Sequence, residues 1–309
     1  MTDSARYRGD YEALRHGAGA VTAARDVLEV TGADAASFLQ GQLSQDVAAL
    51  VTGEAAPSLL LQPDGKLHCL LRVSRRGEDR FVCDLAAGLG EAARERLERF
   101  KLRVDVELRL LRLTMLAVRG AAAPPPPLEA AEQDSDASTP VVVGPVSWGS
   151  VAGWDLVAEE VAIPDGVRLC GPEALEAVRI EAGVPAAQRE LTEGLIPAEA
   201  GITVETVSFT KGCFVGQELV ARIDSRGGNT PRRLRGVVVG DAAPPPVGAE
   251  LTDADGSTVG RVTSSAYSPG LEAAVALAYV HRRLEPPAEA RLAGSDGLPG
   301  EIRTLPLLG

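Results

Sequence analysis

The chain of 309 residues carries 43 acidic and 31 basic side chains, a formal net charge of −12, and 45% of its residues are hydrophobic. Such a composition can form a buried core, and the length predicts two or three domains. The longest apolar run, Ala273 to Val280, is far below the roughly 18 residues that a membrane span needs. Because residues 1–17 lack the apolar centre of a secretory signal, we expect a cytoplasmic protein with no membrane partner.

The cysteines and histidines argue against both a disulfide framework and a metal centre. There are four scattered cysteines and three histidines, with no CxxC pair. A cytoplasmic protein keeps such cysteines as thiols, and zinc or iron-sulfur sites need more closely spaced ligands. We therefore expect free thiols and no metal site built from this chain alone.

Proline runs interrupt the sequence at two places, residues 124–127 and 244–246. The first opens a segment rich in Ser, Asp and Ala that cannot bury enough apolar surface to offset the entropy lost on ordering. We expect a flexible insertion near 121–140, remote from function.

The N-terminal half is expected to combine an antiparallel sheet with helices. Thr31 and Asp34 have the spacing of a capping pair, which predicts a helix over 32–40 that ends at Gly41. A further helix follows the apolar positions from Leu89 to Phe100. The β-favouring segments between turn signals are 58–61, 66–74, 80–85 and 104–113.

The loop between the second and third of these segments sets how two cysteines face each other. If it is centred on Arg76, Cys69 lies opposite Cys83 in the hairpin. The pair could then form a cross-strand disulfide, but in a reducing compartment we favour two small buried hydrophobes.

A later helix is predicted over 172–182, with proline at its first position and Gly183 as its stop. Glu181 lies in its last turn, where a carboxylate meets the negative end of the helix dipole. This unfavourable position suggests either a functional role or, as the residue alone favours, a carboxylate that is solvated or paired with Arg179.

From residue 229 onward the pattern changes to short strands with turn signals, which predicts a small β-barrel. We place the domain boundary at Gly227-Gly228-Asn229. The predicted organisation is an α+β core over 1–228 and a C-terminal β-barrel domain over 229–309.

One segment carries the strongest chemical signal, Lys211 to Glu218 (KGCFVGQE). Val215, Leu219 and Ile223 lie four apart, which predicts a helix with Cys213 near its N-terminus. The dipole there and the charge of Lys211 favour the thiolate form of Cys213, making it a candidate reactive group. The alternative is an inert thiol buried under Phe214.

The same region is basic on an acidic protein. Between Lys211 and Arg235 there are six basic and two acidic residues, a local charge of +4. Such an island could attract a small polyanion, for example a polyglutamyl tail or an RNA phosphate, or could be a solvated face at a domain junction.

These residues resemble the YgfZ-type folate-binding proteins, relatives of the glycine cleavage T-protein (aminomethyltransferase). The resemblance extends over about residues 25–235 and rests on five blocks: the KGCFVGQE segment with VARI and Arg226-Gly227 after it, Phe38 to Val47, Gly65-Lys66, Arg179 to Gly183, and Pro197 to Gly201.

The family resemblance implies two interleaved α+β subdomains that form a folate channel, together with a C-terminal β-barrel. By resemblance Glu181 contacts the pterin ring of tetrahydrofolate or its polyglutamylated form, and Cys213 lies in the signature loop at the channel. The resemblance assigns the remaining folate contacts to Lys211, Gln217, Arg222 and Arg226.

The resemblance also places Cys69 where aminomethyltransferases carry their catalytic aspartate. A neutral thiol does not exchange a proton as a carboxylate does, so aminomethyl transfer is disfavoured and turnover stays uncertain. By resemblance, we expect a tetrahydrofolate-binding accessory protein for assembly or repair of iron-sulfur clusters, with iron-sulfur clients and an indirect link to tRNA-modifying radical enzymes. The alternatives are a tetrahydrofolate-dependent aminomethyl or one-carbon transferase and a folate-binding module that contacts tRNA directly.

Overall fold

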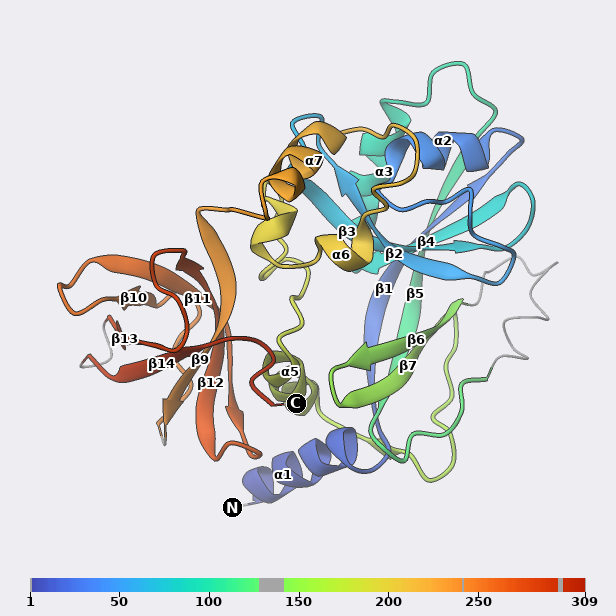
Figure 1. The fold of residues 1–309 in the computed structure, drawn as a ribbon. Helices are drawn as coiled ribbons and strands as arrows, with labels where there is room; N and C mark the ends of the chain where they lie inside the picture. The colour runs from blue at the N-terminus through green and yellow to red at the C-terminus, as the bar shows by residue number, and fades with distance from the viewer. Residues whose placement is uncertain (1, 128–141, 241, 294–296, 309) are drawn as a thin grey trace.

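The computed structural model describes residues 2–127, 142–240, 242–293 and 297–308. Figure 1 shows two sheet structures, a large open sheet and a closed barrel, with a single helix lying between them. That helix is α5 (Pro172–Ala182), which contacts both the N-terminal helix and the barrel. The predicted fold class, α+β with a C-terminal barrel, is confirmed.

The large sheet has eight strands, seven of them in the order β2-β3-β4-β1-β5-β7-β6, with β8 paired to β1. Each pairing is antiparallel except that of β8 with β1. The long central strand β1 pairs with β4 on one side and β5 on the other. The strands are β1 (Gly19–Thr31), β2 (Ala55–Leu61), β3 (Leu67–Arg75), β4 (Arg80–Ala86), β5 (Glu107–Arg119), β6 (Val142–Trp148), β7 (Val151–Ala158) and β8 (Arg168–Leu169).

Helices cover this sheet at its top and its base (Figure 1). Two of those at the top, α2 and α3, share an apolar cluster with β3 and β4, which includes Phe38, Leu97 and Cys83. The helical segments are α1 (Thr2–Arg15), α2 (Ala35–Gln42), α3 (Gly90–Glu98), η2 (Pro197–Glu199), α6 (Thr203–Thr206) and α7 (Gln217–Ser225), besides α5.

The C-terminal strands close into a six-stranded barrel in the order β10-β11-β12-β9-β14-β13. Small and β-branched residues such as Ala276, Ala278 and Val237 fill its interior. The turn between the second and third barrel strands is closed by Asp253, whose carboxylate accepts hydrogen bonds from the backbone N–H groups of Asp255 and Ser257. The strands are β9 (Arg232–Gly240), β10 (Glu250–Thr252), β11 (Thr258–Ser268), β12 (Ala273–His281), β13 (Ala288–Leu292) and β14 (Pro299–Arg303).

The predicted capping pair at the start of α2 is wrong. Thr31 is the last residue of β1, where it pairs with Arg80 and Glu107. Asp34 occupies the N-cap position, but its carboxylate accepts from the backbone N–H of Asp105 over 2.8 Å instead of capping the helix. The helix therefore begins later than predicted, and it continues through Gly41.

The predicted alignment of Cys69 with Cys83 is also wrong. Cys83 pairs with Val73 in the β3–β4 hairpin, whereas Cys69 pairs with Leu60 of β2. The loop is centred two residues later than Arg76, because Arg76 and Arg80 close the turn through a backbone hydrogen bond of 2.8 Å. The two cysteines are therefore not cross-strand neighbours, and both are free buried thiols.

Part of the predicted flexible insertion, residues 128–140, lies outside the described residues. Pro124 lies just before this part, and its carbonyl accepts a hydrogen bond of 2.7 Å from the indole N–H of Trp154. Within the described ranges, no helix has both the length and the apolar composition required to cross a membrane.

Candidate functional site

Lys211 anchors the loop that precedes α7. Its ammonium group donates to three backbone carbonyls at the end of α2 and just beyond, at 2.6 Å to Gln40, 2.7 Å to Leu43 and 2.8 Å to Gln45. It also lies 5.1 Å from the ring centroid of Phe214, a cation–π contact. The lysine therefore points into the protein and ties its loop to α2.

The surroundings of Lys211 shift its acid–base equilibrium. Burial lowers the pKa of Lys211 to about 8, and the negative charge of Asp46 opposes this change. Because all of its donors face carbonyls of the fold, we assign Lys211 a role in positioning the loop and not in contacting a ligand.

The helix after this loop begins at Gln217, four residues beyond Cys213. Cys213 was predicted near the N-terminus of the helix, and it lies before the first helical turn. Gly216, the N-cap residue, has a left-handed backbone with φ of 84°, so α7 does not extend further toward Cys213. Further backbone anchors hold the loop: Val215 donates to the carbonyl of Gly41, and Phe214 donates to the side-chain oxygen of Gln217. Gln217 is thus also a structural contact.

The packing of Gly65 explains why the loop lies where it does. A Cβ atom at Gly65 would lie 2.5 Å from Cβ of Leu219 and 2.7 Å from the carbonyl oxygen of Gly216. The β2–β3 turn and the start of α7 are therefore in direct backbone contact. Within α7 the residue buried against the core is Val220, whereas the predicted stripe residues Leu219 and Ile223 are half-buried.

Cys213 is the exposed cysteine of the four. This contradicts the inert alternative, in which Phe214 covers the thiol. Cys69 and Cys83 lie in the apolar cluster beneath α2 and α3. Burial raises the pKa of Cys69 to about 12 and the pKa of Cys83 further, so both stay protonated at neutral pH. Only Cys213 is presented to solvent for chemistry.

Glu181 is fully buried and both of its carboxylate oxygens are occupied. Arg15 donates to it over 2.7 Å, the hydroxyl of Tyr11 lies 3.0 Å from both oxygens, and the hydroxyl of Ser268 donates to Oε1. Burial raises the pKa of Glu181, while Ser268, Tyr11 and Arg15 act in the opposite direction. Its backbone carbonyl also accepts from the N–H of Leu307.

The predicted pairing of Glu181 with Arg179 is wrong, because the two side chains point to different partners. Arg179 donates to Glu176 over 2.6 Å and to Glu190 over 3.0 Å. The helix dipole is unfavourable for Glu181, and Arg15 on α1 compensates for it with a direct ion pair. Sequence reasoning missed Tyr11 and Arg15, although their spacing of four residues places them on one face of a helix.

The predicted basic island is partly neutralised by the fold. Lys211 points inward, Arg232 pairs with Glu199 at 2.9 Å, and Arg235 lies 3.9 Å from Glu285. Arg222 and Arg226 are exposed on α7 and at its C-terminal cap. The exposed part of the island is therefore smaller than the sequence suggested.

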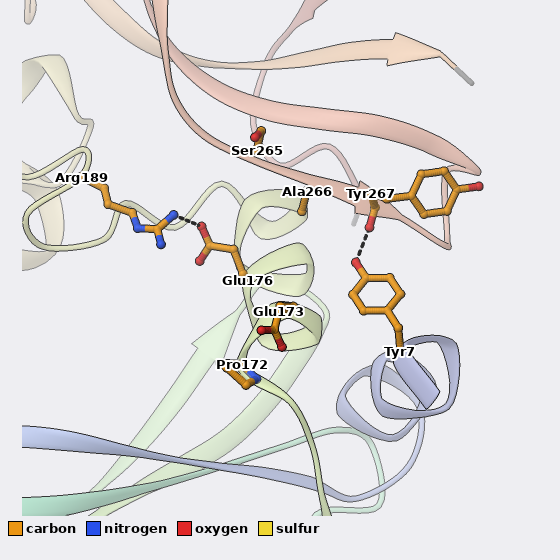
Figure 2. Close-up of a pocket in the computed structure, with 8 residues that line it drawn as sticks. All are labelled: Tyr7, Pro172, Glu173, Glu176, Arg189, Ser265, Ala266 and Tyr267. Atoms are coloured by element: carbon orange, nitrogen blue, oxygen red, sulfur yellow. Dashed lines mark hydrogen bonds and ion pairs between the residues drawn. The ribbon is translucent and has the colours of Figure 1, made fainter. Parts of the chain in front are cut away.

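The sequence-predicted residues form two separate groups. Lys211, Gln217 and the loop around Cys213 are joined by the contacts above, whereas Glu181 is engaged by α1, β11 and the C-terminal segment. A cavity of about 570 Å³ lies between α1, α5 and β11, where Tyr7 donates to the carbonyl of Tyr267 and Arg189 pairs with Glu176 (Figure 2). None of the predicted site residues lines this cavity.

The carboxylate of Glu181 is not available to bind tetrahydrofolate in this structure. A pterin would need that carboxylate as a free acceptor, and it is buried beneath Tyr11, Arg15 and Ser268. Among the described residues, no group of three or more His, Cys, Asp or Glu side chains is arranged to hold a metal ion.

Comparisons with known proteins agree on the fold. Residues 232–298 match the family of the glycine cleavage T-protein C-terminal barrel domain. The crystal structure of the glycine cleavage system aminomethyltransferase T from Bartonella henselae aligns with a TM-score of 0.81 and 21% identity, over 98% of this chain and 89% of that chain. An uncharacterized protein from Haemophilus influenzae is 27% identical over 210 residues, 66% of this chain and 67% of that protein. The chain therefore has the aminomethyltransferase T fold, including its C-terminal barrel.

Proposed function

We propose that this chain is an accessory protein of the aminomethyltransferase fold that acts on partner proteins through Cys213 and supports assembly or repair of iron-sulfur clusters. The observation that carries the proposal is the contrast between the cysteines: Cys213 is exposed, whereas Cys69, Cys83 and Cys170 are buried. The loop that bears Cys213 is fixed by the three carbonyl contacts of Lys211. Because Lys211 anchors this loop, the thiol of Cys213 has a defined position on the surface.

The surroundings of Cys69 support an accessory role over aminomethyl transfer. The thiol lies in an apolar cluster, 4% exposed, and burial raises its pKa to about 12. A group with that pKa does not exchange protons with a substrate near neutral pH. The family resemblance places Cys69 at the position of the catalytic aspartate. The chain would therefore lack the carboxyl group that aminomethyl transfer uses at this position.

Support for tetrahydrofolate as a ligand comes from the fold alone. Of the proposed contacts, Lys211 and Gln217 hold the loop and Glu181 is covered, which leaves Arg222 and Arg226 exposed. A calorimetric titration with tetrahydrofolate tests this part of the proposal. Saturable binding that Arg222→Gln and Arg226→Gln weaken supports it, and the absence of binding removes folate from the account.

Complementation tests the thiol part of the proposal. Cells that lack the chromosomal copy receive wild type, Cys213→Ala or the matched control Cys170→Ala, and the activities of iron-sulfur enzymes are compared with those of enzymes without clusters. We expect wild type and Cys170→Ala to restore the iron-sulfur activities and Cys213→Ala to fail at equal protein level. Equal restoration by Cys213→Ala would reject the proposal. Radical enzymes that modify tRNA are suitable reporters, and the proposed link to tRNA is indirect.

The domain boundary near residue 229 stays a prediction. It lies between α7 and β9, at the glycines before the barrel. Limited proteolysis that yields a fragment starting near residue 229 would support it.

A further inference from the structure

Arg96 differs from the other buried arginines in its lack of an acidic partner. Arg96, Arg119 and Arg179 are the arginines buried in the described parts of the chain. Arg119 pairs with Asp155 at 2.8 Å, and Arg179 pairs with Glu190 at 3.0 Å. No described carboxylate lies within 4.0 Å of the Arg96 guanidinium. Among the described residues, its guanidinium therefore has no ion-pair partner.

The contacts of Arg96 fix its position without neutralising it. One terminal nitrogen donates to the carbonyl of Leu61 over 2.9 Å and the other to the side-chain oxygen of Gln42 over 3.3 Å. The guanidinium lies 3.9 Å from the ring centroid of Phe100. Its Nε–H is buried and has no hydrogen-bond partner. Part of its donor capacity is therefore unused in an environment where unpaired donors are costly.

Arg96 lines a cavity between α3 and the β2–β3 turn, with a volume of about 500 Å³. This volume is within the roughly 300–1,000 Å³ of small-molecule sites. Arg99, one turn further along the chain, and His68 on β3 also line it. The charge of Arg99 adds to burial in lowering the pKa of Arg96, so the two guanidinium groups act on each other across this part of the cavity.

Three carboxylates also line the cavity, those of Asp64, Glu95 and Glu193. Asp64 pairs with Lys66 at 2.9 Å, and Glu193 accepts from the side-chain amide of Gln62 over 2.8 Å. Lys66 compensates the charge of Asp64, whereas Gln62 is neutral, and His68, whose Nδ1 lies 3.2 Å from Glu193, compensates Glu193 only when it is protonated. Carboxylates in the lining repel a ligand with several negative charges, so a ligand on the two arginines is expected to carry a single one.

We propose that this cavity binds a small carboxylate, held by the guanidinium groups of Arg96 and Arg99. A guanidinium presents parallel N–H donors that match the two oxygens of a carboxylate. A buried charge without a counter-ion is unfavourable, and a bound carboxylate supplies that counter-ion. The site is separate from both Cys213 and Glu181.

The test is a nuclear magnetic resonance titration of the full chain with acetate, phosphate and chloride at equal ionic strength. We expect acetate to give saturable shifts in α3 and the β2–β3 turn, stronger than those from phosphate, and chloride to give none. Arg99→Gln should weaken acetate binding about tenfold, the loss of one charge-assisted hydrogen bond. Arg94→Gln is the matched control, because Arg94 lies on the same helix but pairs with Glu91.

Several results would overturn the proposal. Acetate shifts no different from those of chloride, stronger binding of phosphate, or unchanged acetate binding in Arg99→Gln each contradict it. Arg96→Lys keeps the charge but loses the planar donors, so it should also bind acetate more weakly. If the Arg96 variant does not fold, Arg99→Gln decides, since that side chain is exposed. Thiol labelling of Cys213 should be the same in all of these variants, which separates this test from that of the proposed function.

Discussion

Arg15 and Glu181 form an ion pair of 2.7 Å in which both side chains are almost completely removed from solvent. The pair joins α1 to the last turn of α5. Ser268 from the barrel and the backbone N–H of Leu307 contact the same glutamate. One residue thus connects the N-terminal helix, the central helix, the barrel and the C-terminal segment.

Removal of Arg15 should therefore destabilise the whole protein. Arg15→Met leaves a buried carboxylate without its counter-ion, and we expect a loss of about 3–5 kcal/mol in the free energy of unfolding. Arg261→Met, which breaks an exposed pair with Glu250, should cost less than about 1 kcal/mol. Urea denaturation measures both. Equal, small losses would show that Glu181 does not depend on Arg15.

The burial of three cysteines predicts selective labelling. In the native protein, N-ethylmaleimide should modify Cys213 alone, because Cys69, Cys83 and Cys170 are buried and burial raises the pKa of each. After unfolding, all four should react. Mass spectrometry of the intact protein and its peptides gives the count and the position. Native labelling at a second cysteine would contradict the described packing.

The contact between the β2–β3 turn and α7 can be tested at Gly65. Gly65→Ala introduces a Cβ that meets Leu219 and Gly216 at a φ of 82°. Gly53→Ala has a similar backbone, with φ of 95°, and nothing within 4 Å. We expect about 1–2 kcal/mol of lost stability from the backbone at both sites and about 1–3 kcal/mol more at Gly65 from overpacking. Equal losses in urea denaturation would show that the contact is absent.

Lys211 should control the order of the Cys213 loop. Lys211→Met removes the hydrogen bonds to Gln40, Leu43 and Gln45, and we expect faster exchange of the backbone amide of Val215, which bonds to Gly41. Lys66→Met is the control, since its partner is the exposed Asp64. Hydrogen exchange read by mass spectrometry separates the two. Unchanged exchange in Lys211→Met would contradict the anchoring role.

Stability should fall in acid through Asp84, which is fully buried. Although burial raises its pKa, ion pairs with Arg72 at 2.8 Å and Arg25 at 3.0 Å lower it overall. A carboxyl with a lowered folded pKa stabilises the protein above its unfolded pKa, and this stabilisation is lost as the pH falls toward the folded value. Asp84→Asn should thus be less stable than wild type at pH 7, with the gap narrowing below about pH 4. A gap independent of pH would contradict this.

The sequence was sufficient for the elements with strong local signals. Proline at the first turn and Gly183 at the end delimit α5 as predicted, and the alternating strands of the hairpin and the barrel are present. The signals failed where a tertiary contact decided the outcome. The Asp34 carboxylate does not cap α2 because it accepts a hydrogen bond from the backbone N–H of Asp105. The hairpin turn is centred two residues beyond Arg76.

The candidate site was predictable in its residue types but not in its geometry. The exposure of Cys213 and the inward direction of Lys211 depend on how the loop packs on α2 and the β2–β3 turn, which no local pattern encodes. The same holds for Glu181. Its unfavourable place in the helix was visible in the sequence, but its partners Tyr11 and Arg15 are more than 150 residues away, at separations of 170 and 166.

Restoration of an iron-sulfur enzyme in extract from cells lacking the protein tests the central claim most directly. The purified protein is added before and after modification of Cys213 by N-ethylmaleimide, with Cys213→Ala as an unmodifiable reference. The account predicts that wild type restores the enzyme activity and that the modified protein and Cys213→Ala do not. Full restoration by the modified protein would show that the exposed thiol is not the functional group.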